Sequence, residues 1–578
     1  MTRPVAIPGE DMSLAHSLAG FHPPKSIVPT DLLDKLVPPE KYSVFYDGVY
    51  VERAGALVQI TTAPIFICAR GTDLVTGRAL RQVIWYSRGT GWHARFFPRE
   101  KLLSAAGIRL LVSYDVSVTP ECTGALIRYL FDFEQANADN LITMSLSTRM
   151  GWLPDGSFLL PDVHLTPPDS ELSLYLAPTP TFESMLPAWN PAGSWADWIA
   201  SVRTVLDYPH MMLALYASAA APLLRILGTP GFVIDFNGET SGGKTTALRL
   251  AASVWGASSD EHPSSLFSWD ITKNWSERLC YFLHSLPVIL DDTKQTRHRH
   301  RVSQIVYSFC QGKGSMTSKR NANLSWRTIL ISSGEAPAIS YSKHAGILAR
   351  VLSVPGKPLG SDIQRGARLS EDLQRVLRVN YGHLGRRIIE YLVSNQNNRI
   401  AFQQLFQQLS ADYAEVAGSP IGRRHARNLA CLEVAASIVH QLGVPKPTVD
   451  PFSILLESIK EVEEDADHPL SAFAYICEWS VMNASNFWGR QDAHTPPQAG
   501  WAGSWKASDD WSYIGFVRER LDQLLRSAGY YPQDILPVWK ERGWFDDKPR
   551  RRVRVGGGIT ACLCLRRSAV EHALEETH

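Results

Sequence analysis

The chain has 578 residues, several times the usual domain length of roughly 100 to 200, so the sequence predicts several domains with ample cores. Charged residues make up 20% of the chain and hydrophobic residues 45%, a balance that excludes an intrinsically disordered protein. The formal net charge of +1 excludes nucleic-acid binding through bulk charge, so any such contact must come from local basic patches.

The N-terminal part divides into an arm and a β-rich domain. Residues 1–40 contain many prolines and no basic-then-apolar signal pattern, and they predict an extended arm. Short β-prone runs broken by glycines and turn pairs then predict a β-rich N-terminal domain over residues 41–190. The proline-rich tract 177–191 at the end of this domain is typical of a linker.

The next part alternates helices with apolar strands. This alternation predicts a parallel sheet with crossover helices in an α/β domain over residues 191–365. The longest apolar stretch, Met211 to Leu224, covers about 14 residues and is too short to cross a bilayer. We expect it to form a buried helix in a cytoplasmic protein without a membrane partner.

One segment of this α/β domain matches the P-loop pattern, and it lies between the apolar run 232–236 and a helical run. Glycines let backbone N–H groups converge on phosphate oxygens at a helix N-terminus. Lys244 would neutralise the β- and γ-phosphates, and the Thr245 hydroxyl would bind Mg²⁺, so ATP and Mg²⁺ are the expected cofactors. The expected nucleotide-binding residues are Gly238, Glu239, Thr240, Ser241, Gly242, Gly243, Lys244, Thr245 and Thr246.

A second acidic motif follows at a suitable distance. The apolar run 286–290 predicts a buried strand that ends in Asp291 and Asp292, as a Walker B strand does. Asp291 would hold Mg²⁺ through water, and Asp292 would polarise the attacking water as general base. A pair of aspartates that merely caps a turn is the alternative, and the nearby P-loop favours the Walker B interpretation.

Two further candidates lie on the strands that come next. The strand predicted over 328–331 leads to the polar run Ser332 to Glu335, in which Ser333 is the candidate site residue. Arg350 precedes the strand-like run 351–354. On spacing alone, Arg350 is either an ordinary surface or ion-paired residue or an arginine finger that completes the site of a neighbouring subunit.

The remainder of the chain predicts a helical region over 366–490, a linker over 491–510 and a small domain over 511–578. In the small domain, helices over 513–528 and 535–542 followed by a β-ribbon indicate a winged-helix-like fold. An arginine run begins the ribbon and would either grip backbone phosphate or dock on the ATPase core. The candidates for DNA contact in this run are Arg550, Arg551, Arg552 and Arg554.

From about Tyr42 to its end, the chain resembles domain-of-unknown-function family 927. This family comprises helicase-like ATPases of phages, plasmids and other mobile elements, related to superfamily-three and MCM-type ring helicases. The segments that carry the resemblance are Gly151-Trp152, Gly238 to Thr245, Ser268-Trp269, Thr272 ahead of Glu277, Leu290-Asp291-Asp292, Gly312-Lys313-Gly314, Trp326-Arg327-Thr328, Ser332 to Glu335, and Ala345-Gly346 with Arg350.

The resemblance implies a multidomain α/β fold with an AAA+ P-loop ATPase core. It also implies a homohexameric ring that uses ATP hydrolysis to move along DNA, each site being completed by the next subunit. Under this interpretation Arg350 is the arginine finger, and the catalytic set is Lys244, Asp291, Asp292, Ser333 and Arg350.

The sequence departs from the family pattern at two places. Asp292 stands where the family more often has glutamate, although superfamily-three motors use the Asp-Asp form. After Gly312-Lys313-Gly314 we expect a lysine and then an arginine, but Ser315 and Thr317 occupy these positions. The candidates for DNA contact in this loop are Lys313, Lys319 and Arg320, against the alternative that they are ordinary solvated charges.

The sequence thus predicts an ATP-dependent DNA helicase or translocase of a phage or mobile element. Single-stranded or forked DNA is the expected partner, and a separate primase or loader protein would supply any priming, since no primase motif or zinc module is readable. One alternative is a nucleotide-switched scaffold, or a regulatory or defence ATPase, that hydrolyses weakly and does not unwind DNA. Another is a motor that acts on RNA and differs only in its substrate.

Overall fold

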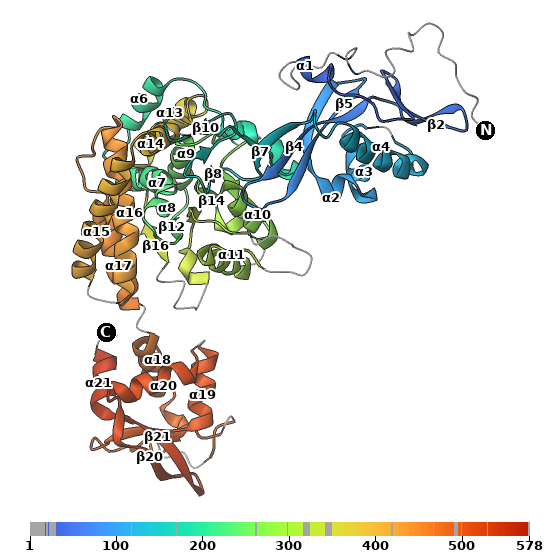
Figure 1. Cartoon of the computed structure of the whole chain (residues 1–578). Helices are drawn as coiled ribbons and strands as arrows, with labels where there is room; N and C mark the ends of the chain where they lie inside the picture. Colours follow the sequence, from blue (N-terminus) through green and yellow to red (C-terminus); the bar gives the residue numbers. More distant parts are fainter. Residues whose placement is uncertain are drawn as a thin grey trace. The chain divides into compact units, whose positions relative to one another are not determined.

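The computed structural model describes residues 18, 21, 30–116, 118–168, 170, 172–259, 263–296, 299–315, 324–341, 350–417, 420–465, 468–490, 495–498, 500–528 and 530–575. The chain separates into two compact units. Unit 1 comprises Met1–Tyr341, Arg350–Val416 and Arg424–Leu455, and unit 2 comprises Ser342–Ala349, Ala417–Arg423 and Leu456–His578. Both units combine helices with sheets, and Figure 1 labels their elements. None of the described helices has the length and apolarity needed to cross a lipid bilayer.

Three β-sheets and short helices form the first part of unit 1. Its main sheet has the strand order β11-β7-β4-β5-β6, and two smaller sheets have the orders β1-β2-β3 and β10-β9-β8. The strands are β1 (Tyr42–Phe45), β2 (Gly48–Arg53), β3 (Ala56–Thr61), β4 (Ile65–Asp73), β5 (Ala79–Ser87), β6 (Gly91–Pro98), β7 (Ile142–Ser147), β8 (Gly151–Trp152), β9 (Phe158–Leu159), β10 (His164–Leu165) and β11 (Leu174–Leu176). The helices are α1 (Thr30–Leu33), α2 (Arg99–Leu102), α3 (Ala105–Val112), α4 (Thr123–Ala136) and α5 (Pro180–Glu183).

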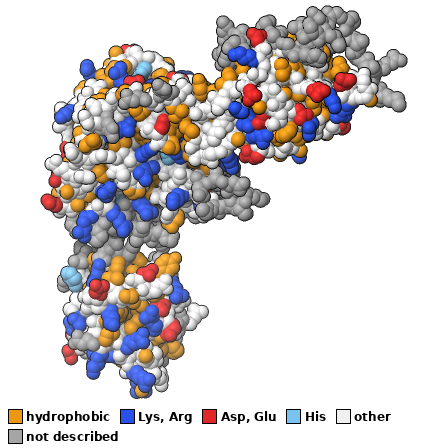
Figure 2. All heavy atoms as spheres, viewed as in Figure 1, with side chains coloured by type: hydrophobic (Ala, Val, Ile, Leu, Met, Phe, Trp, Pro, Cys, Tyr) orange, Lys and Arg blue, Asp and Glu red, His pale blue; other side chains and the backbone are white. Residues whose placement is uncertain are grey.

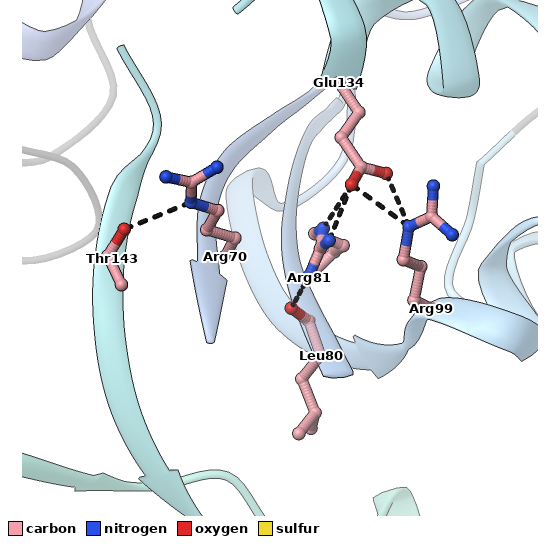
Figure 3. A network of polar contacts seen from close by, with 6 residues as sticks. All are labelled: Arg70, Leu80, Arg81, Arg99, Glu134 and Thr143. Atoms are coloured by element: carbon pink, nitrogen blue, oxygen red, sulfur yellow. Dashed lines mark hydrogen bonds and ion pairs between the residues drawn. The ribbon is translucent and has the colours of Figure 1, made fainter. Parts of the chain in front are cut away.

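Charged side chains fix α4 on the main sheet (Figure 3). The Glu134 carboxylate on α4 accepts a hydrogen bond from Arg81 Nη2 of β5 at 2.6 Å and from Arg99 Nε of α2 at 3.0 Å. The side chains of Glu134 and Arg81 are only 10% and 11% exposed, so water screens this pair weakly. Removing one partner would leave a buried charge without compensation, which makes the network a strong constraint on the helix.

Of the predicted extended arm, residues 1–40, the structure describes only residues 18, 21 and 30–40, and several of these are buried. Leu18, Phe21, Leu32, Leu33 and Leu36 are buried in the same apolar cluster as the main sheet and α4. The apolar side chains of these described residues pack into a core, which the proline-rich composition of the segment did not predict.

The tract 177–191, predicted as a linker, also packs. Phe182 stacks on Phe282 with ring centroids 4.4 Å apart, and Trp189 is 2% exposed. Two buried aromatic rings outweigh the loop-like composition of this tract.

The centre of unit 1 is a five-stranded sheet with the order β13-β14-β15-β12-β16, in which every pairing is parallel. Parallel strands buried on both faces require crossover helices, which is why the sequence alternates between the two. The strands are β12 (Phe232–Asn237), β13 (Phe267–Ser268), β14 (Val288–Asp291), β15 (Ile329–Gly334) and β16 (Val351–Pro355). The helices around them are α6 (Trp195–Arg203), α7 (Pro209–Ala220), α8 (Leu223–Ile226), α9 (Lys244–Ser253), α10 (Lys273–Leu283) and α11 (Arg299–Gln311).

The long apolar stretch forms a buried helix, as predicted. Residues Met211 to Ala220 of α7 are all buried, and the helix packs against α9 and β15. The Trp255 indole after α9 donates to the Ser218 carbonyl at 3.1 Å. These contacts fix α9, and with it the loop that precedes it, on the sheet.

Five helices follow β16, and the predicted helical region 366–490 is divided between the two units, because α18 belongs to unit 2. The helices are α13 (Ile363–Leu377), α14 (His383–Ser394), α15 (Gln396–Ala417), α16 (Pro420–Gln441) and α17 (Phe452–Asp465). Within unit 1, Tyr216 of α7 stacks on Phe452, with ring centroids 6.1 Å apart. Gly385 of α14 lies so close to the Trp255 ring that a Cβ there would come within 2.4 Å of it.

Unit 2 has its own core, built around a five-stranded sheet with the order β17-β18-β19-β21-β20. Phe473 of α18 packs edge-on against Trp539 of α20, with ring centroids 5.0 Å apart. The elements are α18 (His468–Met482), β17 (Phe487–Trp488), β18 (Gly503–Ser504), β19 (Tyr513–Val517), α19 (Arg518–Ser527), α20 (Pro532–Glu541), β20 (Phe545–Val555), β21 (Gly558–Arg566) and α21 (Arg567–Glu575).

Two predictions for this region differ from the structure. The predicted linker 491–510 contributes β18 and the buried Trp505 to the core of unit 2, because its tryptophans anchor a segment otherwise rich in loop formers. The helix predicted from Tyr513 begins only at Arg518, since the β-prone run 513–517 pairs with β21. The predicted helix at 535–542 and the strand at the arginine run are present as α20 and β20.

Candidate functional site

The glycine-rich loop (Gly238–Gly243) links β12 to α9 and turns through three residues with positive φ. These are Gly238 at 137°, Ser241 at 63° and Gly243 at 89°, the last being the residue before α9. Glycine adopts such backbone angles without a steric penalty. The first N–H groups of α9 have no partner within the helix, so the loop and the helix start form an anion-binding geometry.

Lys244 begins α9 and folds back over the glycine-rich loop. Its ammonium donates to the carbonyl oxygens of Gly238 at 2.8 Å and Glu239 at 2.5 Å. Partial burial lowers the pKa of Lys244, whereas the nearby carboxylates of Glu335, Asp292 and Asp291 raise it. The ammonium is thus held at the mouth of the loop, where it faces acidic residues from other strands.

The carboxyl ends of β14 and β15 bring the predicted acidic and polar residues together. Ser333 Oγ donates to Asp291 Oδ1 at 2.5 Å and accepts from the Asp292 amide at 3.0 Å. This contact crosses between the two strands, so Asp291, Asp292 and Ser333 form one rigid cluster.

Asp292 has an unusual backbone for a non-glycine residue, with φ at 61°. Its Oδ1 accepts from the Lys294 amide at 3.1 Å, and this bond caps the short turn after β14. The Asp292 carboxylate therefore already has one hydrogen-bond partner within its own turn. The strained backbone turns this side chain toward the glycine-rich loop.

A cavity of about 540 Å³ lies at this edge of the sheet. It is lined by the glycine-rich loop, by Lys244, Thr245 and Thr246, and by the cluster of Asp291, Asp292 and Ser333. All the residues predicted to bind nucleotide beyond Gly238, and all the predicted catalytic residues except Arg350, thus share one cavity. This volume is in the range of small-molecule sites.

The other wall of the cavity was not predicted from the sequence. It comes from the connection after β16 and the start of α13, where Lys357, Leu359 and Ile363 line the cavity. The Leu359 amide donates to the Gly242 carbonyl at 3.3 Å, and the Lys357 ammonium lies 2.9 Å from a Glu239 carboxylate oxygen. The sequence signal for this connection was Gly356, a glycine shortly after the predicted strand 351–354. In the structure its φ is 116°.

Among the described residues, no group of three or more His, Cys, Asp or Glu side chains is arranged to hold a metal ion. The donors present are the Thr245 hydroxyl and the Asp291 carboxylate, both on the cavity wall. Mg²⁺ commonly takes one or two protein oxygens and completes its shell with water and phosphate, so this donor set fits it.

Arg350 lies at the opposite end of β16 from the cavity. Its carbonyl accepts from the Val233 amide at 2.9 Å, and its side chain is exposed. The five residues of β16 span roughly 16 Å, so this arginine does not reach the cavity of its own chain.

The predicted DNA contacts fall in two places. Lys313 is exposed and pairs with Ser325, so that the described segments 312–315 and 324–326 form a paired hairpin base ahead of β15. Lys319 and Arg320 lie outside the described residues. On β20 in unit 2, Arg550, Arg552 and Arg554 are exposed at alternate positions. Figure 2 shows Lys and Arg side chains gathered over the β20–β21 hairpin.

Arg551 faces the other way from these three. Its guanidinium pairs with Asp546 and lies 4.9 Å from the centroid of the Tyr513 ring. The Arg551 side chain therefore packs against its neighbours and is not part of the exposed face of the β20–β21 hairpin.

The sequence profile of one family, described as "Domain of unknown function (DUF927)", matches residues 40–328. No curated protein matches the sequence. Among solved structures, the chain resembles "SCCmec type IV Cch - active helicase" with a TM-score of 0.67 and 18% identity, covering 92% of this chain and 99% of that one. A second structure, the apo A form of the NrS-1 C-terminal region, is 9% identical over 69% of this chain and 92% of its own, but its TM-score of 0.24 is too low to support an argument.

Proposed function

The chain belongs to the DUF927 family, and on that premise we propose that it is an ATP-dependent DNA helicase or translocase of a phage or other mobile element. A protein described as an active helicase has the same fold over nearly its whole length, which supports the helicase class. The observation that carries the proposal is the cavity that joins the glycine-rich loop to Asp291, Asp292 and Ser333.

We assign the central sheet to an AAA+ core. In support, all five strands are parallel, and β15 with Ser333 separates the P-loop strand β12 from β14 with Asp291. The order of α19, α20 and the β20–β21 hairpin supports a winged-helix-like assignment for the end of the chain.

In the proposed reaction, the loop amides and Lys244 bind and orient the triphosphate. Thr245 and Asp291 would hold Mg²⁺, which neutralises charge on the phosphates. Asp292 accepts a proton from the attacking water, and Ser333 fixes the Asp291 carboxylate and the backbone amide of Asp292.

We propose that the active form is a ring, a homohexamer, with sites between subunits. The support is Arg350, which is exposed and lies roughly 16 Å of strand away from its own cavity. In a ring it would reach the cavity of the next subunit and stabilise transition-state charge there. Lys313, with Lys319 and Arg320 in the same loop, and the exposed arginines of β20 would contact DNA phosphates.

The deciding experiment is steady-state ATP hydrolysis by the full chain with and without single-stranded or forked DNA, with Lys244→Ala as the blank. The proposal expects DNA to stimulate turnover and the blank to be silent. Abundant ATP binding with no stimulated turnover would refute the helicase proposal.

ATP binding without DNA-stimulated turnover would favour a nucleotide-switched scaffold that hydrolyses weakly. One observation supports this alternative: the Asp292 carboxylate already accepts a hydrogen bond from its own turn. A base held in this way is less available to water.

A further inference from the structure

Glu277 of α10 is a carboxylate buried within the α/β core, with only 1% of its side chain exposed. Its Oε1 accepts from Ser308 Oγ of α11 at 3.1 Å and from Ser315 Oγ at 2.8 Å. Lys273, one turn earlier on α10, places its ammonium 3.8 Å from the same oxygen. Burying a carboxylate is costly unless hydrogen bonds satisfy it, so these donors hold the side chain in one position.

Ser315 belongs to the base of the hairpin that carries Lys313. The hairpin opens at Gly312, with φ at 65°, and its two arms are joined where the Gly314 amide donates to the Leu324 carbonyl at 2.8 Å. The Trp326 amide donates to the Gly312 carbonyl at 3.0 Å. A Cβ placed on Gly314 would lie 3.4 Å from Glu277 Oε2, so the hairpin base rests directly on the carboxylate.

The chain just before this helix is tied to the end of β14. Trp269, just before α10, donates from its indole to Ser332 Oγ at 3.1 Å and from its amide to the Asp291 carbonyl at 3.1 Å. Thr272 caps α10 by accepting from the Trp275 amide at 3.2 Å. A short, rigid run of chain therefore connects the end of β14 with the carboxylate that holds the hairpin.

We propose that Glu277 is a positioning residue that fixes the hairpin base, segments 312–315 and 324–326, on the ATPase core, so that DNA held at Lys313 stimulates ATP turnover. The second part of the proposal rests on the proposed function. It also explains why Ser315 stands where a lysine was expected: its hydroxyl links the hairpin to Glu277 rather than to DNA.

The first test is hydrogen exchange of the Gly314 and Trp326 amides in the full chain without DNA. Ser315→Ala and Glu277→Ala should speed their exchange roughly fivefold or more, because the hairpin loses its anchor. Glu277→Gln keeps an acceptor oxygen and should restore most of the protection. Ser308→Ala is the matched control: it removes a donor to the same oxygen, but from within α11, and should change exchange by less than about twofold. Unchanged exchange in both Ser315→Ala and Glu277→Ala would overturn the proposal.

The second test is ATP turnover with and without an oligo-deoxythymidine strand. Ser315→Ala should lower DNA-stimulated turnover roughly fivefold and leave basal turnover within about twofold, while Ser308→Ala should leave both close to wild type. An equal loss of basal and stimulated turnover in Ser315→Ala would contradict positioning. If DNA fails to stimulate the wild-type protein, the proposed function falls, and the exchange experiment still decides whether Glu277 fixes the hairpin.

Discussion

Ser333 makes two hydrogen bonds that set the geometry of the candidate catalytic cluster, one to the Asp291 carboxylate and one from the Asp292 amide. Ser333→Ala leaves both groups without this partner in a site that is largely shielded from water. We expect ATP turnover to fall on the order of tenfold or more, with ATP affinity within about threefold of wild type. Steady-state kinetics and equilibrium binding of ATP measure the two quantities.

The neighbouring Ser332 provides the control. It lies on the same strand and is as deeply buried, but its hydroxyl accepts from the Trp269 indole and does not line the cavity. Ser332→Ala should therefore reduce turnover less than Ser333→Ala. Equal losses would indicate a general weakening of β15 instead of a role for Ser333 in catalysis.

His284 gives a prediction for pH. Burial and the nearby charges of Arg149, Arg225 and Arg327 lower its pKa from 6.5 to about 3, so the imidazole is neutral in the folded chain. Below pH 6.5 the unfolded chain binds a proton that the folded chain does not, and stability is lost as pH falls from about 6.5 toward 3. The loss approaches 1.4 kcal/mol per pH unit within this window.

The variant His284→Asn tests this linkage. Asparagine removes the titrating ring and keeps an acceptor for Arg149 Nη1, which contacts His284 Nδ1 at 3.1 Å. The melting temperature of the wild type should fall more steeply than that of the variant between pH 7.5 and 5.5. Parallel curves would show that other groups dominate the acid sensitivity.

At the scale of elements, the cavity depends on the connection between β16 and α13. Lys357 on this connection pairs with Glu239 of the glycine-rich loop at 2.9 Å, and the pair lowers the pKa of Glu239. Both side chains are well exposed, so the pair adds little to stability, but it places a second cation at the cavity.

We expect Lys357→Ala to weaken ATP binding roughly three- to tenfold, because a cation facing the phosphates is lost. Glu239→Gln should leave affinity unchanged or raise it slightly, since it frees the ammonium. Calorimetric titration with a non-hydrolysable ATP analogue measures both. Equal weakening in the two variants would mean that the ion pair acts by holding the loop.

The glycine-rich loop and the β16–α13 connection show which parts of the cavity can be predicted from sequence and which cannot. The glycine-rich loop and the two aspartates could be singled out from the sequence because their signals are local: a glycine-rich turn and an apolar run that ends in carboxylates. Lys357 and Leu359 join the cavity only because β16 pairs with β12, and no local pattern encodes that pairing. In unit 2 the composition of 491–510 suggested a linker, yet Trp505 is buried in a core that forms only from distant segments.

At the scale of the whole molecule, the position of Arg350 constrains how the chain functions. It lies at the amino end of β16, whereas the cavity is at the carboxyl ends of the strands. If Arg350 is a finger, it acts on another copy of the chain. Arg350→Ala should therefore bind ATP normally and lose hydrolysis by a factor on the order of 10³ or more.

Mixing two inactive variants separates action on a neighbouring copy from action within one chain. Lys244→Ala has a defective loop but an intact Arg350, and Arg350→Ala has the reverse defects. In randomly mixed rings, roughly a quarter of the sites combine an intact Lys244 with an intact Arg350 from the next subunit, so turnover should recover to about that fraction of wild type. A mixture as inactive as either variant alone, under conditions where the copies demonstrably exchange, would exclude a site shared between subunits and with it the proposed ring.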